Sequence, residues 1–128
     1  MGVEQLVRFP EAGAFPSWAS VKKRLDEAGF PVQIRMIDGE LSFPDEEPPE
    51  PWRELRIRTS AGMITAKRTG DRLVLVVWGN ADEPLLAARN ALAWAFAAEG
   101  AGRIEEAGAK LSPEQFRQRA PMPQELRA

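Results

Sequence analysis

The chain has 128 residues, which is the size of one domain, and its net charge of −2 at pH 7 gives no overall attraction to nucleic acid or anionic membranes. It contains no cysteine, histidine or tyrosine, so thiolate chemistry, disulfides and the commonest general base and metal ligand are excluded. Because an active site would have to consist of carboxylates, Lys, Arg, Ser or Thr, we expect a protein that is not an enzyme and holds no metal or cofactor.

The N-terminal part predicts a strand followed by a helix. One face of the strand at residues 3–9 carries Val3, Gln5, Val7 and Phe9. The Ser17 hydroxyl can cap a helix that ends near Gly29 and Pro31. The apolar residues of this predicted helix recur at helical spacing; they are Trp18, Val21, Leu25 and Ala28.

Residues 32–43 predict a hairpin. Asp38-Gly39 is typical of a two-residue type I′ turn, in which both central residues need positive φ. This turn would place two apolar pairs on the core face, Met36 with Leu41 and Ile34 with Phe43. The following PDEEPPEP, residues 44–51, lacks the backbone donors of a paired strand, and its carboxylates do not have calcium-loop spacing. We expect it to be an extended acidic connection.

Residues 52–78 predict an antiparallel meander. A turn at Ala61-Gly62 would set Ile57 opposite Ala66, and a turn at Gly70-Asp71 would set Ala66 opposite Leu75. The two turns agree on which face is apolar, whereas a one-residue slip in either would place arginines among the leucines.

A long helix and a short helix complete the predicted domain. Residues 85–99 are apolar all round and follow a cap at Asp82 or Glu83, so both faces need cover. One face should pack on the sheet, and the face of Trp94 needs either the short helix Pro113–Arg119 or another subunit. We expect residues 1–120 to form one domain and residues 121–128 to be a frayed tail.

Together these elements predict an α+β fold with an antiparallel meander sheet of five to six strands. The order is β-α-β-β-β-β-β-α, with helices on one face and a short C-terminal helix. This order is similar to helix-grip and TATA-binding-protein-like layouts. Such a frame suggests two uses: binding through the open sheet face, or holding an apolar ligand between the sheet and the long helix.

The outer face of the sheet is the main candidate site because it combines apolar side chains with cations. Its predicted members are Arg35, Arg56, Arg58, Lys67, Val74, Val76 and Trp78. Exposed apolar surface beside arginine is typical of contact surfaces, so we expect a protein partner or a homodimer. Trp94 is a second candidate contact face. A plain solvated face, an apolar-ligand site, a nucleic-acid surface and a carboxylate enzyme are the alternatives.

The net negative charge disfavours nucleic acid. The first residues have no basic start followed by an apolar run, and no apolar stretch approaches the ~20 residues that span a bilayer. We therefore expect a cytoplasmic location and no membrane partner.

Overall fold

The computed structural model describes residues 3–43, 45–106 and 108–127. In these residues the fold is α+β, with an antiparallel sheet of eight strands. The strands are β1 (Val3–Arg8), β2 (Gln33–Ile37), β3 (Glu40–Leu41), β4 (Glu54–Thr59), β5 (Gly62–Thr69), β6 (Arg72–Val77), β7 (Arg103–Glu106) and β8 (Ala109–Leu111). The helices are α1 (Trp18–Glu27), α2 (Glu83–Gly100) and α3 (Pro113–Arg119), with 3-10 turns η1 (Ala12–Ala14) and η2 (Gln124–Leu126).

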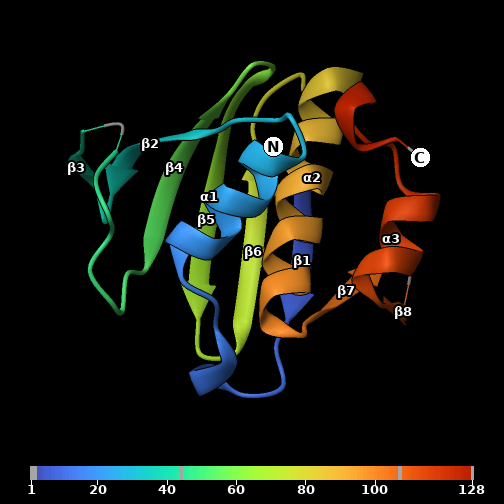
Figure 1. Ribbon diagram of the computed structural model, residues 1–128, viewed down its shortest axis with the longest axis horizontal. Coiled ribbons are helices and arrows are strands. Elements are labelled where there is room, and N and C mark those ends of the chain that lie inside the picture. Colours follow the sequence, from blue (N-terminus) through green and yellow to red (C-terminus); the bar gives the residue numbers. More distant parts are fainter. Residues whose placement is uncertain (1–2, 44, 107, 128) are drawn as a thin grey trace.

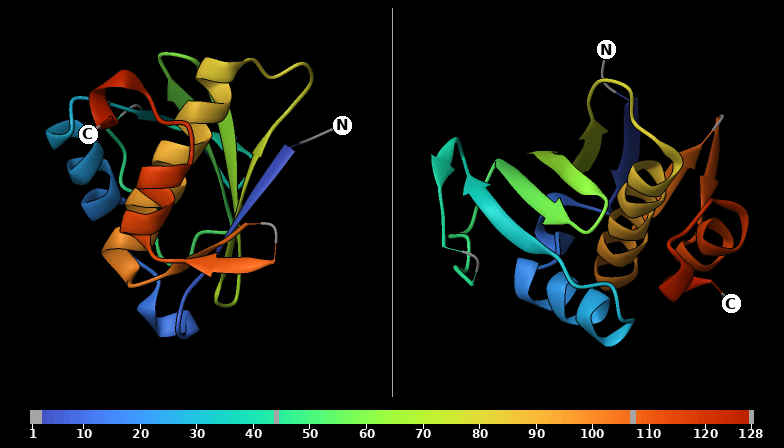
Figure 2. Two further views of the ribbon diagram at one scale, coloured as in Figure 1. Left: turned by 90° about the vertical axis from the view of Figure 1, so that its right-hand side faces the viewer. Right: turned by 90° about the horizontal axis from the view of Figure 1, so that it is seen from above.

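The strand order across the sheet is β3-β2-β4-β5-β6-β1-β7-β8. The first strand therefore lies inside the sheet, between β6 and β7 (Figure 1). The helices gather on one side of the sheet and leave the other side bare (Figure 2). This arrangement defines an inner face that carries the core and an outer face that is open.

The predicted number of strands, five to six, is wrong because β7 and β8 were not expected. After α2 the chain turns back, and Ile104 and Leu111 pair across the β7–β8 hairpin with both side chains buried. These strands have four and three residues, too few for a period of two to stand out in the sequence.

The meander is confirmed, with one change of register. Ala66 lies opposite Leu75 as predicted, whereas Ile57 lies opposite Ile64 instead of Ala66. Thr59 pairs with Gly62, so the turn is one residue earlier than predicted. Because the register differs by two residues, the apolar side chains stay on the inner face.

The predicted hairpin forms at Asp38 and Gly39, but the core pairing expected of it is wrong. Asp38 and Gly39 have positive φ, and Met36 lies opposite Leu41. The register of β2 against β4 shifts between Ile34 and Met36, as in a β-bulge. Ile34 and Ile37 are therefore both buried, Met36 is turned out of the core, and the strand β3 ends at Leu41.

As a result the two apolar residues expected in the core are exposed. Leu41 is 85% exposed and Phe43 is 75% exposed, and the predicted pairing of Phe43 with Ile34 is absent from the described registers of β2. One extra residue in β2 accounts for this, because it reverses the side to which the rest of the strand and its partner point.

The core lies between α2 and the inner face of the sheet. Ala88, Leu92 and Phe96 of α2 are fully buried, as are Ile57 and Leu75 of the sheet. The side chain of Asp82 accepts a hydrogen bond from the backbone N–H of Leu85 and so caps α2 as expected. In the described residues no helix is long and apolar enough to cross a bilayer.

The second face of α2 is covered by the same chain. Trp94 is only 5% exposed, with the guanidinium of Arg24 from α1 at 5.5 Å and that of Arg117 from α3 at 5.1 Å from its ring centroid. The helix α3 has the predicted bounds and a capping box formed by Ser112 and Gln115.

The segment after α3 is packed, so the prediction of a frayed tail is wrong for residues 121–127. Met122 and Leu126 are buried in the core cluster. Arg117 Nε donates a hydrogen bond to the carbonyl of Leu126 at 2.9 Å, and Asn90 Nδ2 donates to the carbonyl of Pro121 at 2.9 Å. Two apolar side chains at spacing four therefore anchor this segment against α2 and α3.

Candidate interaction surface

The outer face of the sheet follows from alternation along each strand. In β6, Leu73, Leu75 and Val77 are fully buried under the helices, so Val74 and Val76 must point to the outer side. The cross-strand registers extend this assignment to the neighbouring strands. The charged outer residues so assigned are Glu4, Arg8, Glu54, Arg56, Arg58, Lys67, Arg72, Arg103, Glu105 and Lys110.

Six of the seven predicted surface residues lie together on β4–β6 and just after β6. Arg56, Arg58 and Lys67 are exposed, Val74 is half-buried and Val76 is 4% exposed. Trp78 is 57% exposed, and Lys67 Nζ lies 5.7 Å from the centroid of its ring. The structure thus presents a tryptophan, cations and valines on one open surface.

Arg35 is set apart from this group. It is exposed in the bulge of β2, between Ile34 and Met36, where regular alternation is interrupted. The remaining prediction, Trp94, is on the helical side and is closed by Arg24 and Arg117 of the same chain. We therefore leave both residues out of the candidate surface.

Two adjoining hollows make the outer face concave. The first, about 450 Å³, is lined by Glu4, Lys67, Thr69, Arg72, Val74, Val76 and Trp78. The second, about 590 Å³, is lined by Glu4, Leu6, Arg72, Val74, Glu105, Glu106, Gly108 and Lys110. Because both are lined by Glu4, Arg72 and Val74, we treat them as one feature and name it the outer groove.

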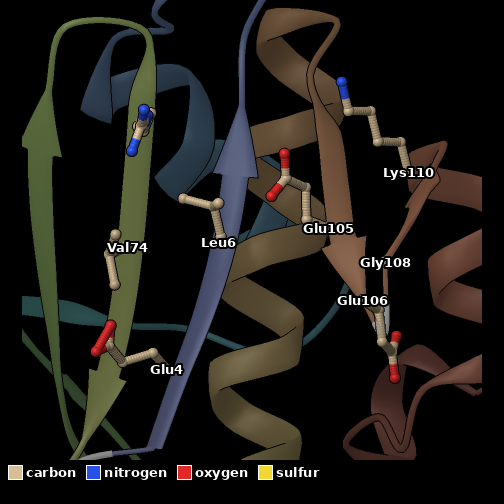
Figure 3. Close-up of a pocket in the computed structure, with 8 residues that line it drawn as sticks. Glu4, Leu6, Val74, Glu105, Glu106, Gly108 and Lys110 are labelled. Carbon is tan, nitrogen blue, oxygen red and sulfur yellow. The ribbon is translucent and has the colours of Figure 1, made fainter.

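Charge is distributed along the outer groove. Figure 3 shows Lys110 toward one end and Glu4 and Glu106 toward the other, with Leu6 and Val74 between them. In the pairing of β1 with β6, Arg72 lies opposite Arg8, and this is the end of β1 that is furthest from Glu4. The groove therefore has an apolar floor, one end rich in cations and one end with carboxylates.

Three of the cations form a row across neighbouring strands. Arg8 lies directly opposite Arg72 of β6 on one side and directly opposite Arg103 of β7 on the other. Glu105 accepts a hydrogen bond from Arg8 Nε at 3.1 Å. Among the described residues, Arg72 and Arg103 form no ion pair within 4.0 Å.

Sequence reasoning missed this part of the site. The alternation of Glu4, Leu6 and Arg8 was visible in the sequence, but their neighbours were not. The row exists because β1 pairs with β6 and β7, which lie some 70 and 100 residues further along the chain. Nothing local in the sequence signals those two pairings.

The outer face has a charge opposite in sign to that of the whole chain. On β1 and β4–β8 the cross-strand registers place seven cations and three carboxylates on the outer face, a net charge of +4, and Glu106 also lines the groove; the whole chain carries −2. The positive potential is therefore concentrated on the bare side of the sheet, and the excess of acidic residues lies elsewhere.

Among the described residues, no group of three or more Asp or Glu side chains is placed to hold a metal ion. The pKa of Arg89 on α2 is lowered because burial penalises its charge, and the carboxylate of Glu106 partly opposes this shift. Arg89 donates hydrogen bonds from Nε and Nη2 to Asn90 Oδ1, and Asn90 Nδ2 in turn donates to the carbonyl of Pro121, which links α2 to the segment after α3.

No protein-family model matches the chain, and no curated protein and no solved structure is detectably similar to it. The helix-grip or TATA-binding-protein-like layout stays a prediction from the order of elements.

Proposed function

We propose that this protein is a non-enzymatic interaction module that binds another protein through the outer groove. The observation that carries the proposal is Trp78, which is 57% exposed beside Lys67 and lines the outer groove together with Val74 and Val76. Lys67 Nζ lies 5.7 Å from the centroid of the Trp78 ring, and tryptophan is one of the residues enriched in the binding hot spots of protein interfaces.

The shape of the face supports a protein segment as the occupant. The groove crosses β5, β6, β1, β7 and β8, and its floor of Leu6, Val74 and Val76 offers apolar contact under a charged rim. An apolar centre inside a polar rim is the usual anatomy of an interface. A partner with apolar side chains and complementary charge would cover this centre.

The alternatives fit the face less well. In a symmetric dimer that packs two copies of the outer face together, two surfaces of net charge +4 would repel each other. Nucleic acid would bring its phosphates close to Glu4 and Glu105 in the groove. An apolar ligand between sheet and α2 would have to displace Leu92 and Phe96, which already fill that space.

The proposal is tested by site-specific photo-crosslinking. Met63 is exposed, lies opposite Arg58 and follows the turn at the edge of the outer face, so a p-benzoylphenylalanine there would report on a partner bound near Trp78. In lysate from cells that make the protein, we expect one crosslinked partner, which an excess of wild-type protein removes and an excess of Trp78→Ala protein does not.

The matched control carries the same photo-reactive residue at Gln118, which is exposed on α3 at the helical side. Equal crosslinking from both positions, or competition by the Trp78→Ala protein as strong as by the wild type, would contradict the proposal. If position 63 crosslinks only to a second copy of the chain, we would conclude that the protein self-associates through this face and does not bind a different protein there.

A further inference from the structure

Arg103, Arg8 and Arg72 form a row of like charges on the outer face, and the stability of the fold gives no reason for this row. Side chains directly opposite each other on antiparallel strands are close neighbours, and like charges in such positions destabilise the sheet. Glu105 neutralises one of the three arginines. The remaining two positive charges have no carboxylate within ion-pairing distance among the described residues.

We propose that Arg72, which lines the outer groove, forms an anion-binding subsite with its neighbours Arg8 and Arg103, and that this subsite receives the carboxylates of an acidic polypeptide segment lying in the groove. The inference depends on the proposed function, because it assigns the charge of the segment that the groove would bind. The carboxylates of such a segment would supply the negative charge that the row lacks. Planar guanidinium groups bind carboxylates through paired N–H donors, which suits this role.

The groove favours polypeptide over nucleic acid as the source of the anion. Next to the row the floor consists of Leu6 and Val74, and the far end carries Glu4. A polypeptide can combine carboxylates at one end with apolar side chains in the middle. A nucleic acid strand carries a phosphate at every step, and several of these would meet Glu4 and Glu105.

The test uses poly-L-glutamate as the probe and isothermal titration at low salt as the measurement. Arg72→Gln with Arg103→Gln removes two cations from the row and leaves the Arg8–Glu105 pair intact. We expect this double variant to bind poly-L-glutamate about tenfold more weakly than the wild type, since charge-assisted contacts of this kind change affinity by about that factor.

The matched control is Lys23→Gln with Arg119→Gln, which removes two exposed cations from the helical side, on α1 and α3. We expect this control to stay within about twofold of the wild type, because its two cations lie on the helical side of the sheet and do not face the groove. An equal loss in both double variants would overturn the subsite, as it would show a response to net charge alone.

A poly-dT oligonucleotide of the same total charge provides the second comparison. Poly-dT that binds more tightly than poly-L-glutamate, with binding that Arg72→Gln and Arg103→Gln abolish, would assign the row to nucleic acid and overturn the proposal. The outcome is separable from the proposed function. A crosslink from position 63 that persists while poly-L-glutamate affinity is unchanged in the row variant would defeat the subsite alone.

Discussion

Arg8 of β1 and Arg72 of β6 occupy directly opposite positions on the outer face, and Arg103 of β7 lies opposite Arg8 on its other side. Each opposition places two positive side chains at a position where unlike charges would stabilise the sheet. We therefore expect this part of the surface to reduce the stability of the unliganded protein.

The first prediction is that Arg72→Gln with Arg103→Gln stabilises the free protein. Because Arg8 is already paired with Glu105, relief of the two oppositions should raise the free energy of unfolding by no more than about 0.5 kcal/mol at low salt. Thermal unfolding followed by circular dichroism measures this, and the gain should shrink in high salt because the repulsion is screened. The control, Lys23→Gln with Arg119→Gln, should show no gain in stability. A loss of stability in the variant with Arg72→Gln and Arg103→Gln would contradict the inference that the row of arginines is repulsive.

The second prediction separates the two tryptophans that were proposed as contacts. Trp94→Ala removes a buried ring that Arg24 and Arg117 cover, so we expect a loss of about 3–5 kcal/mol in unfolding free energy. Trp78→Ala removes an exposed ring and should cost less than about 1 kcal/mol. Urea unfolding measures both. Because the cover of Trp94 is intramolecular, the midpoint should not depend on protein concentration, and a dependence would point to cover by another subunit.

The third prediction concerns the C-terminal segment. Leu126 is fully buried in the core cluster, so Leu126→Ala should destabilise the protein by about 2–5 kcal/mol. Gln124→Ala, two residues away and exposed, is the control and should change stability by less than about 0.5 kcal/mol. Chemical denaturation distinguishes the outcomes, and equal small effects would mean that residues 121–127 are frayed after all.

The fourth prediction concerns the close approach of α2 to the segment after β1. A Cβ at Gly100 would lie 2.6 Å from Phe9 Cε1 and 2.8 Å from Pro16 Cδ, both in buried residues. Gly100→Ala should therefore overpack this contact and cost about 1–3 kcal/mol. At Gly13 a Cβ would meet no atom within 4 Å, so Gly13→Ala should be neutral or slightly stabilising in the same thermal unfolding assay. A neutral Gly100→Ala would show that Phe9 moves aside freely.

Features that depend on neighbouring residues could be predicted from the sequence. The dipeptide Asp38-Gly39 predicted the position of the hairpin, and both residues have the positive φ that its turn needs. The capping residues Ser112 and Gln115 predicted the start of α3. Alternation along β4 to β6 was enough to assign inner and outer faces, because a register error of two residues does not change the face. The predicted surface cluster around Lys67 and Trp78 depended on this local pattern.

Features that depend on distant pairings could not be predicted. The bulge between Ile34 and Met36 has no turn residue to mark it, yet it moves Leu41 and Phe43 out of the core. Arg8, Arg72 and Arg103 become neighbours only when β1 enters the sheet between β6 and β7. The half of the outer groove that sequence reasoning missed is the half that these long-range pairings create.

The interior position of β1 has a consequence for how the chain is made. The strand β1 leaves the ribosome well before β6 and β7, so it must wait for both of them before its two edges are paired. Until then the nascent chain exposes an unpaired strand edge, the kind of edge that promotes association between incomplete chains. The outer groove likewise forms only when β1 pairs with β6 and β7, so a fragment that lacks β1 or the β7–β8 hairpin cannot carry it.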